Sequence, residues 1–186
     1  MNILDLVRAL RRDSVTDPAI LERERSRLMA TIREETRPQG KLPPRGQRII
    51  PQLPYLDQRA AVEFLERAFG FRELVSARVI DAKGAIVHTA VEIGGAEVMI
   101  GGHGGHDALS PKSLGRISML LSVYVDDVEA HCARARAAGA RIVAELEDKF
   151  WGDRVYEVLD LEGHRWRFHE HLRSVPQEEW NFQGDE

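Results

Sequence analysis

The sequence predicts an α+β protein made of two βαβββ modules that form a cup-shaped mixed sheet, with an extra N-terminal helical arm. The main observation is an internal repeat: YLDQRAAVEFLERAFGF starts at Tyr55, and YVDDVEAHCARARAAGA starts 69 residues later at Tyr124. In each copy an Asp, Asp57 or Asp126, precedes a Gly by thirteen residues, a spacing typical of a capped helix. Downstream, VEIGGAEVMI (91–100) and LDLEGHRWRF (159–168) align as paired strands around equivalent Gly turns.

Each copy therefore reads as a strand, a helix and three further strands. In the first module, 48–101, the helix is expected at 58–69 and the strands at 48–56, 72–80, 86–94 and 96–101. In the second module, 117–171, the helix is expected at 127–138 and the strands at 117–125, 140–147, 153–160 and 164–171. Two such modules side by side bend their sheets into an open cup, with the helices on the outer faces.

The chain outside these modules differs in composition. Residues 1–36 are predicted to form an N-terminal arm of two short helices, and 37–47, which contain RPQGKLPPR, form a Pro-rich linker. The main domain is expected at 48–173. Residues 174–186 contain four acidic residues and no basic one, so they are expected to form an acidic, solvated tail.

Composition excludes several classes of protein. The 186 residues are 43% hydrophobic and carry a net charge of only −4, which gives no reason to expect nucleic acid as a partner. Neither a membrane-spanning stretch nor an apolar N-terminal leader is visible, so we expect a cytoplasmic protein with no membrane partner. The single cysteine, Cys132, excludes an internal disulfide and is expected to be a small, partly buried thiol in a helix.

The repeat resembles the glyoxalase, bleomycin-resistance and extradiol-dioxygenase (vicinal oxygen chelate) superfamily over residues 48–171. Besides the helix motifs, the stretches HTAVEIGGAEVMI and FWGDRVYEVLDLEGHRWRF carry the resemblance, and FWGDR followed by LEGHRW is similar to the PhnB-like branch. The resemblance implies a site inside the cup and a homodimer. It does not imply one activity, because members include isomerases, dioxygenases, thiol transferases and proteins that sequester a drug.

Metal-dependent members place four His or Glu ligands in the cup. By alignment these positions fall at Ile50, Met99, Leu120 and Arg167, none of which normally binds a hard or borderline divalent ion. We therefore predict no metal in the usual site and no cofactor. An alternative is a relocated metal site that combines two His of one cluster, either His103 and His106 or His169 and His171, with a Glu or Asp from elsewhere.

Strand alternation predicts which side chains face the cup. Arg165, Arg167 and His169 are expected to face inward, with Trp166 and Phe168 on the helix side. Arg167 either binds an acidic group of a ligand or pairs with Glu97 across the cup. The predicted ligand-binding residues are Gln52, Glu97, Met99, Leu120, Ser122, Trp151, Tyr156, Arg165, Arg167 and His169.

Three functions fit this pattern. The first is a protein that binds a small hydrophobic or anionic organic molecule, such as an antibiotic or a metabolite, without turning it over. The second is an enzyme of the same superfamily, a lyase, isomerase or dioxygenase, that is metal-independent or has relocated metal ligands. The third is an interaction module that docks a partner through its basic N-terminal arm. The catalytic residues, if any, are not identifiable from the sequence.

Overall fold

Each repeat copy folds around one helix whose start is capped by an aspartate. In the computed structural model, which describes residue 47 and residues 49–180, α3 (Gln58–Phe69) begins after Asp57 and α5 (Val128–Ala137) after Asp127. Each Asp accepts a hydrogen bond from a backbone N–H three residues ahead, at 2.9 Å for Asp57 and 2.8 Å for Asp127. The second cap is therefore Asp127, one residue later than the expected Asp126.

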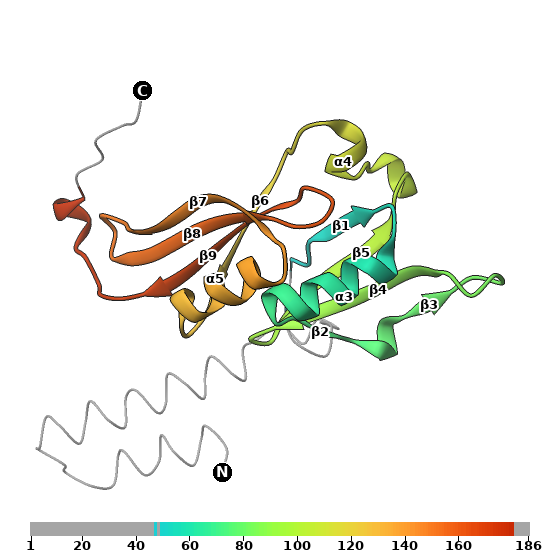
Figure 1. The fold of residues 1–186 in the computed structure, drawn as a ribbon, viewed down its shortest axis with the longest axis horizontal. Coiled ribbons are helices and arrows are strands. Elements are labelled where there is room, and N and C mark those ends of the chain that lie inside the picture. The colour runs from blue at the N-terminus through green and yellow to red at the C-terminus, as the bar shows by residue number, and fades with distance from the viewer. Residues whose placement is uncertain (1–46, 48, 181–186) are drawn as a thin grey trace, which may run out of the picture. The chain divides into compact units, whose positions relative to one another are not determined.

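The strands form two mixed sheets, one for each module (Figure 1). The first sheet has the order β1–β5–β4–β2, with β3 also paired to β4, and the second has the order β6–β9–β8–β7. In both sheets the first strand runs parallel to the last and all other pairs are antiparallel. The strands are β1 (Gln52–Tyr55), β2 (Arg72–Glu73), β3 (Val79–Ile80), β4 (Ile86–Ile93), β5 (Ala96–Gly102), β6 (Leu120–Tyr124), β7 (Arg141–Asp148), β8 (Asp153–Leu159) and β9 (Arg165–His171). The predicted α+β class and the duplication are confirmed.

The first module departs from the prediction at 72–80. The expected single strand is divided into β2 and β3 by a 3₁₀ turn at Val75–Ala77. Near this turn the buried carboxylate of Glu73 accepts hydrogen bonds from Arg78 Nε at 2.9 Å and from Thr89 Oγ1 at 2.7 Å. A short helix, α4 (Pro111–Leu114), lies in the connection between the modules. The predicted arm at 1–36, nearly all of the linker and residues 181–186 lie outside the described residues.

The two modules share one hydrophobic core around α3 and α5, which lie beside each other (Figure 1). Trp166 and Phe168 of β9 are fully buried in it, and the Phe69 ring of α3 lies 5.8 Å and 5.1 Å from theirs, centroid to centroid. Cys132 of α5 is 3% exposed. Burial of these rings is the main stabilising term, since removal of such a side chain costs about 3–5 kcal/mol.

The turn between β8 and β9 joins the modules through a buried carboxylate. Asp160 accepts hydrogen bonds from Tyr55 Oη at 2.6 Å, from Trp166 Nε1 at 3.1 Å, and from the backbone N–H groups of Glu162 and His164 at 3.0 Å each. These five residues are called the Asp160 cluster below. Glu162 also accepts from Leu56 N, at the start of the first module's helix region. The turn that contains the LEGHRW stretch therefore contributes contacts between the two modules.

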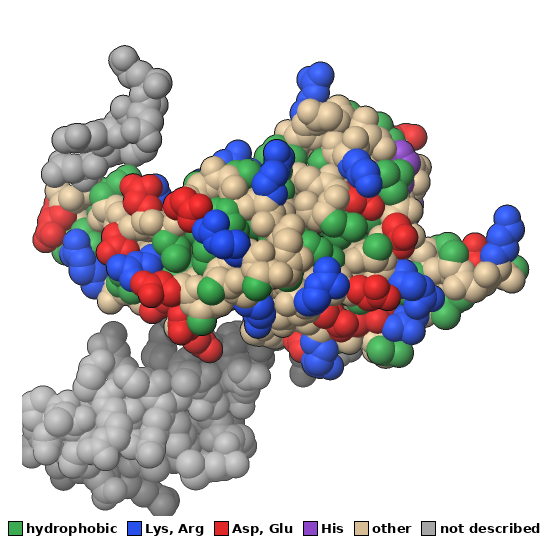
Figure 2. Space-filling view, in the orientation of Figure 1, with side chains coloured by type: hydrophobic (Ala, Val, Ile, Leu, Met, Phe, Trp, Pro, Cys, Tyr) green, Lys and Arg blue, Asp and Glu red, His purple; other side chains and the backbone are tan. Residues whose placement is uncertain are grey.

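The surface carries both signs of charge. Lys and Arg side chains are interspersed with Asp and Glu on the face shown in Figure 2. Within the described residues, none of the helices has the length and apolar character needed to cross a bilayer.

Candidate functional site

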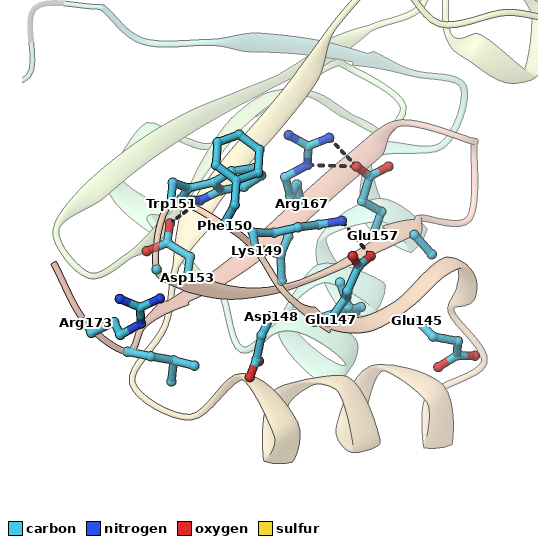
Figure 3. Close-up of a pocket in the computed structure, with 15 residues that line it drawn as sticks. Glu145, Glu147, Asp148, Lys149, Phe150, Trp151, Asp153, Glu157, Arg167 and Arg173 are labelled. Atoms are coloured by element: carbon cyan, nitrogen blue, oxygen red, sulfur yellow. Dashed lines mark hydrogen bonds and ion pairs between the residues drawn. The ribbon is translucent and has the colours of Figure 1, made fainter. Parts of the chain in front are cut away.

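A groove of about 980 Å³ lies along one end of the second sheet. Its floor comes from β7, β8 and β9, and one wall comes from the FWGDR turn between β7 and β8. It is lined by Ala144, Glu145, Glu147, Asp148, Lys149, Phe150, Trp151, Gly152, Asp153, Val155, Tyr156, Glu157, Arg167, Leu172 and Arg173. Figure 3 shows Phe150, Trp151 and Arg167 among the side chains that line this space, with Lys149 extending from the turn. This space is called the Trp151 groove below.

The turn that carries Trp151 depends on Gly152. Gly152 has a φ of +99°, which L side chains rarely adopt, and an added Cβ would lie 2.0 Å from the carbonyl oxygen of Arg173. The turn is closed by hydrogen bonds from Lys149 N to Asp153 O and from Gly152 N to Lys149 O. The Trp151 ring is then fixed by its Nε1, which donates to Asp153 Oδ2 at 3.0 Å. The backbone therefore presents a half-buried indole to the groove.

One carboxylate holds both arginines of β9. Glu157 of β8 lies opposite Arg167 in the sheet and accepts from Arg167 Nε at 2.7 Å and from Arg165 Nε at 2.6 Å. Burial opposes ionisation of Glu157, but the hydrogen bonds from Arg167 and Arg165 hold its pKa below the ordinary value. Two positive charges thus share one negative charge. The expected pairing of Arg167 with Glu97 is wrong, because Glu157 is its partner and Glu97 belongs to the first sheet.

A second buried carboxylate, Asp153, collects four side chains. It accepts from Tyr124 Oη at 2.8 Å and from Trp151 Nε1, and it lies 2.9 Å from His171 Nδ1 and 3.3 Å from His169 Nδ1. These residues are called the Asp153 cluster. Burial acts to raise the pKa of Asp153, but the hydrogen bonds from His171, Tyr124, Trp151 and His169 outweigh it and lower the pKa. Asp153 is therefore ionised at neutral pH.

Histidine 169 is the most unusual member of this cluster. Burial lowers its pKa below the ordinary value although Asp153 acts in the opposite direction. Its Nε2 is buried and has no hydrogen-bond partner among the described residues. The ring lies against that of Tyr124, with 4.9 Å between centroids, and Tyr124 is 62% exposed. His169 is therefore a neutral imidazole at pH 7, with one nitrogen left unsatisfied.

The predicted site residues fall on both sheets. On β9 the predicted alternation is confirmed, because Trp166 and Phe168 are fully buried whereas Arg165 and Arg167 are partly exposed. On β6, Leu120 pairs with Arg165 and Ser122 pairs with Arg167. The first sheet holds Gln52, Glu97 and Met99, and none of these lines the Trp151 groove.

Of the ten predicted residues, only Trp151, Tyr156 and Arg167 line the Trp151 groove. The side chain of Tyr156 is fully buried, and its hydroxyl lies 2.7 Å from His131 Nδ1. It offers no ring face for a flat aromatic contact. Sequence reasoning missed Glu157 and Phe150. Glu157 could have been predicted as the partner of Arg167, because the two residues lie equally far along the chain from the turn between β8 and β9.

Two of the positions that the resemblance aligns with metal ligands, Met99 and Arg167, lie on β5 and β9. The register places Met99 beside Gln52 and Arg167 beside Ser122, and neither pair offers an imidazole or carboxylate. Among the described residues, no group of three or more His, Cys, Asp and Glu side chains is arranged to hold a metal ion. For the relocated alternative, His103 Nδ1 accepts from Ser110 N, and both His169 and His171 face Asp153 through Nδ1.

The duplicated βαβββ sheets and the groove can be compared with known proteins. The sequence profile of the Glyoxalase/Bleomycin resistance protein/Dioxygenase superfamily matches residues 51–168. The chain belongs to this superfamily. An uncharacterized protein of Mycobacterium tuberculosis is 36% identical over 135 residues, which cover 70% of this chain and 78% of that protein.

Two solved structures are similar to the chain in fold. TioX from Micromonospora sp. ML1 is 38% identical, with a TM-score of 0.54, and the match covers 70% of this chain and all of TioX. A glyoxalase/bleomycin resistance protein/dioxygenase family enzyme from Burkholderia phytofirmans PsJN is 21% identical, with a TM-score of 0.53, over 65% of this chain and 95% of the other. The second likeness supports the fold alone.

Proposed function

We propose that this superfamily member binds a small aromatic organic molecule in the Trp151 groove without using a bound metal. The observation that carries the proposal is that the fixed indole of Trp151 and the guanidinium of Arg167 line one space of about 980 Å³, which is in the size range of small-molecule pockets. The ring can stack on a planar ligand, and the guanidinium can bind an acidic group or stack on a ring.

The charges favour a ligand with one acidic group at most. Arg167 lines the groove, and its guanidinium can bind one ligand carboxylate or phenolate although Glu157 already pairs with it. The lining carries more acidic than basic side chains, which argues against a polyanion. The acidic ones are Glu145, Glu147, Asp148, Asp153 and Glu157, and the basic ones are Lys149, Arg167 and Arg173. The proposed ligand class is therefore a hydrophobic aromatic molecule that is neutral or carries a single acid, such as an antibiotic or a metabolite.

A screen followed by matched variants tests the proposal. Hydrophobic acids and aromatic antibiotics are screened by thermal shift, and the dissociation constants of hits are measured by calorimetry. Trp151→Ala is expected to weaken binding by about tenfold, because a stacking contact of about 1 kcal/mol or more is lost. Val79→Ala, on the exposed β3 of the other sheet, is the control and leaves binding unchanged. Equal binding by wild type and Trp151→Ala would contradict the proposal.

An enzyme remains the second candidate because of one observation, the contact between Asp153 and His169. A carboxylate that orients a neutral imidazole is the arrangement used by general bases. Mass spectrometry of a bound hit after prolonged incubation separates the two functions. An unchanged ligand supports a binding protein, and a product that fails to form with His169→Phe supports an enzyme. The interaction-module alternative rests on the arm, which lies outside the described residues.

We also propose that the protein is a cytoplasmic homodimer of the PhnB-like branch. The dimer is supported by the family, since members of this superfamily commonly pair. Gln52, Glu97 and Met99 belong to the first sheet and do not line the Trp151 groove. Light scattering on the full chain measures the mass directly. A monomer at micromolar concentration would contradict the dimer, while the proposal for the Trp151 groove would stand.

A further inference from the structure

Two buried histidines of the second module differ in how their ring nitrogens are satisfied. His131 uses both: Nε2 lies 3.0 Å from the carbonyl oxygen of Phe69, and Nδ1 lies 2.7 Å from the Tyr156 hydroxyl. A carbonyl oxygen can only accept, so Nε2 of His131 carries the proton and Nδ1 accepts from Tyr156. His169 uses one nitrogen only, Nδ1, which faces Asp153.

The partner of His169 fixes which nitrogen carries its proton. Asp153 is ionised and can only accept, so Nδ1 of His169 donates to it. Burial keeps the imidazole neutral, as the lowered pKa shows. A neutral ring protonated on Nδ1 has a lone pair on Nε2. The unsatisfied atom is therefore an acceptor, and the group that completes it must be a donor.

An unsatisfied buried acceptor is rare in a folded protein and costs free energy. Nε2 of His169 is the only buried side-chain nitrogen or oxygen without a partner among the described residues. The comparable Asp160 cluster, also buried, satisfies its Tyr hydroxyl, its Trp N–H and its carboxylate entirely from within the chain. Of the two clusters, only the Asp153 cluster, which borders the Trp151 groove, thus contains a buried acceptor without a partner among the described residues.

The neighbours of His169 place it next to the Trp151 groove. Asp153, its hydrogen-bond partner, lines the groove, and so does Val155, which is paired with His169 across the sheet. Arg167, two residues earlier on the same face of β9, lines it as well. The Tyr124 ring lies against the imidazole on the other side and is largely exposed. The imidazole therefore lies behind residues that line the groove, and access of a ligand to Nε2 requires these side chains to move.

We infer that Nε2 of His169 accepts a hydrogen bond from an O–H or N–H donor of the ligand, with Asp153 as the positioning residue that fixes the tautomer. This inference rests on the proposed function, and it defines the ligand class further. The ligand carries a neutral donor on its aromatic ring, as in a phenol, a naphthol or an aryl amide. A site built to satisfy such a donor selects strongly against analogues that lack it.

Two probes of nearly the same shape test the donor requirement. The full chain is titrated with 2-naphthol, which has the donor, and with 2-fluoronaphthalene, which does not. Both affinities are measured from NMR chemical shift changes. Wild type is expected to prefer 2-naphthol by about fivefold to tenfold, the usual effect of one hydrogen bond. His169→Phe keeps the ring shape without the acceptor and is expected to bind both probes equally. His169→Gln, whose amide oxygen can accept, is expected to restore part of the preference.

The outcomes separate this inference from the proposed function. If both probes bind in the groove and His169→Phe leaves their ratio unchanged, the inference is wrong and the proposed function stands. If neither probe binds wild type at its solubility limit, both fail. A measurement that needs no variant is the tautomer of His169 at pH 7 from long-range ¹H–¹⁵N correlations. A proton on Nδ1 alone is expected, and a proton on Nε2 would overturn the inference.

Discussion

Two tyrosines at equivalent positions of the repeat, Tyr55 and Tyr124, each donate a hydrogen bond to a buried aspartate, but in different surroundings. Tyr55 is fully buried and donates to Asp160 at 2.6 Å, whereas Tyr124 is 62% exposed and donates to Asp153 at 2.8 Å. Each aspartate also accepts from one indole, Trp166 in the first case and Trp151 in the second.

The difference lies in what completes each cluster. Backbone N–H groups of the turn between β8 and β9 complete the Asp160 cluster, which therefore joins the modules and leaves no polar group for a ligand. Two histidines complete the Asp153 cluster, and one of them keeps an unsatisfied nitrogen beside the Trp151 groove. A buried aspartate that accepts from a tyrosine and a tryptophan thus stabilises the fold in the Asp160 cluster. The same arrangement forms part of the candidate site in the Asp153 cluster.

Between the two clusters, the largest difference in stability is expected when each indole is removed. Trp166→Ala removes a fully buried ring and should lower the free energy of unfolding by about 3–5 kcal/mol. Trp151→Ala removes a half-buried ring from the groove wall and should cost about 1 kcal/mol while it weakens ligand binding. Urea unfolding of both variants measures the difference. Equal losses of stability would show that the Asp153 cluster is as structural as the Asp160 cluster.

The buried His131 predicts a pH dependence of stability. Burial lowers its pKa to about 4 in the folded chain, below the ordinary value near 6.5. Because the folded state disfavours protonation of His131, the free energy of unfolding is highest above pH 6.5. It decreases as the pH falls from 6.5 towards 4. The full loss is roughly 3 kcal/mol.

Urea unfolding at several pH values between 7.5 and 4 checks this dependence. His131→Phe, which cannot titrate, is the control. The stability difference between wild type and His131→Phe should shift in favour of the variant as the pH falls. A difference that stays constant with pH would contradict a neutral, buried His131.

Removal of the two tyrosine hydroxyls is expected to give a smaller difference in stability than removal of the two indoles. Tyr55→Phe leaves the buried Asp160 without one donor and should cost about 2 kcal/mol, as for hydrogen bonds to a charged group. Tyr124→Phe should cost less than about 1 kcal/mol, since water can replace the hydroxyl of an exposed ring. Thermal unfolding of the two variants compares one deleted hydroxyl with the other. A larger loss for Tyr124→Phe would reverse the roles given to the two clusters.

Much of the fold could be predicted because it depends on local signals. The Asp caps, the Gly-centred turns and the alternation on β9 all follow from short stretches of sequence, and the predicted burial of Trp166 and Phe168 is confirmed. The division of the strand expected at 72–80 was not predicted, and Glu73 there contacts Thr89, which is distant in the sequence and gives no local signal.

The candidate site was predictable only in part. Trp151 and Arg167 were identified from the FWGDR motif and from alternation, and both line the groove. Glu157 and the Asp153 cluster were missed, because they depend on which side chains face each other across strands rather than along one strand. Tyr156 also lines the groove, but its side chain is fully buried, and it pairs with Phe168 across the sheet.

The most direct test of the central claim follows the indole N–H signals of Trp151 and Trp166 while 2-naphthol is added to ¹⁵N-labelled protein. Each indole donates to one of the two aspartates, so the two signals report on the two clusters separately. The Trp151 signal should shift in a saturable manner and the Trp166 signal should stay in place. A shift of Trp166 with Trp151 unchanged would contradict the assignment of the Asp153 cluster as the ligand site and of the Asp160 cluster as a structural one.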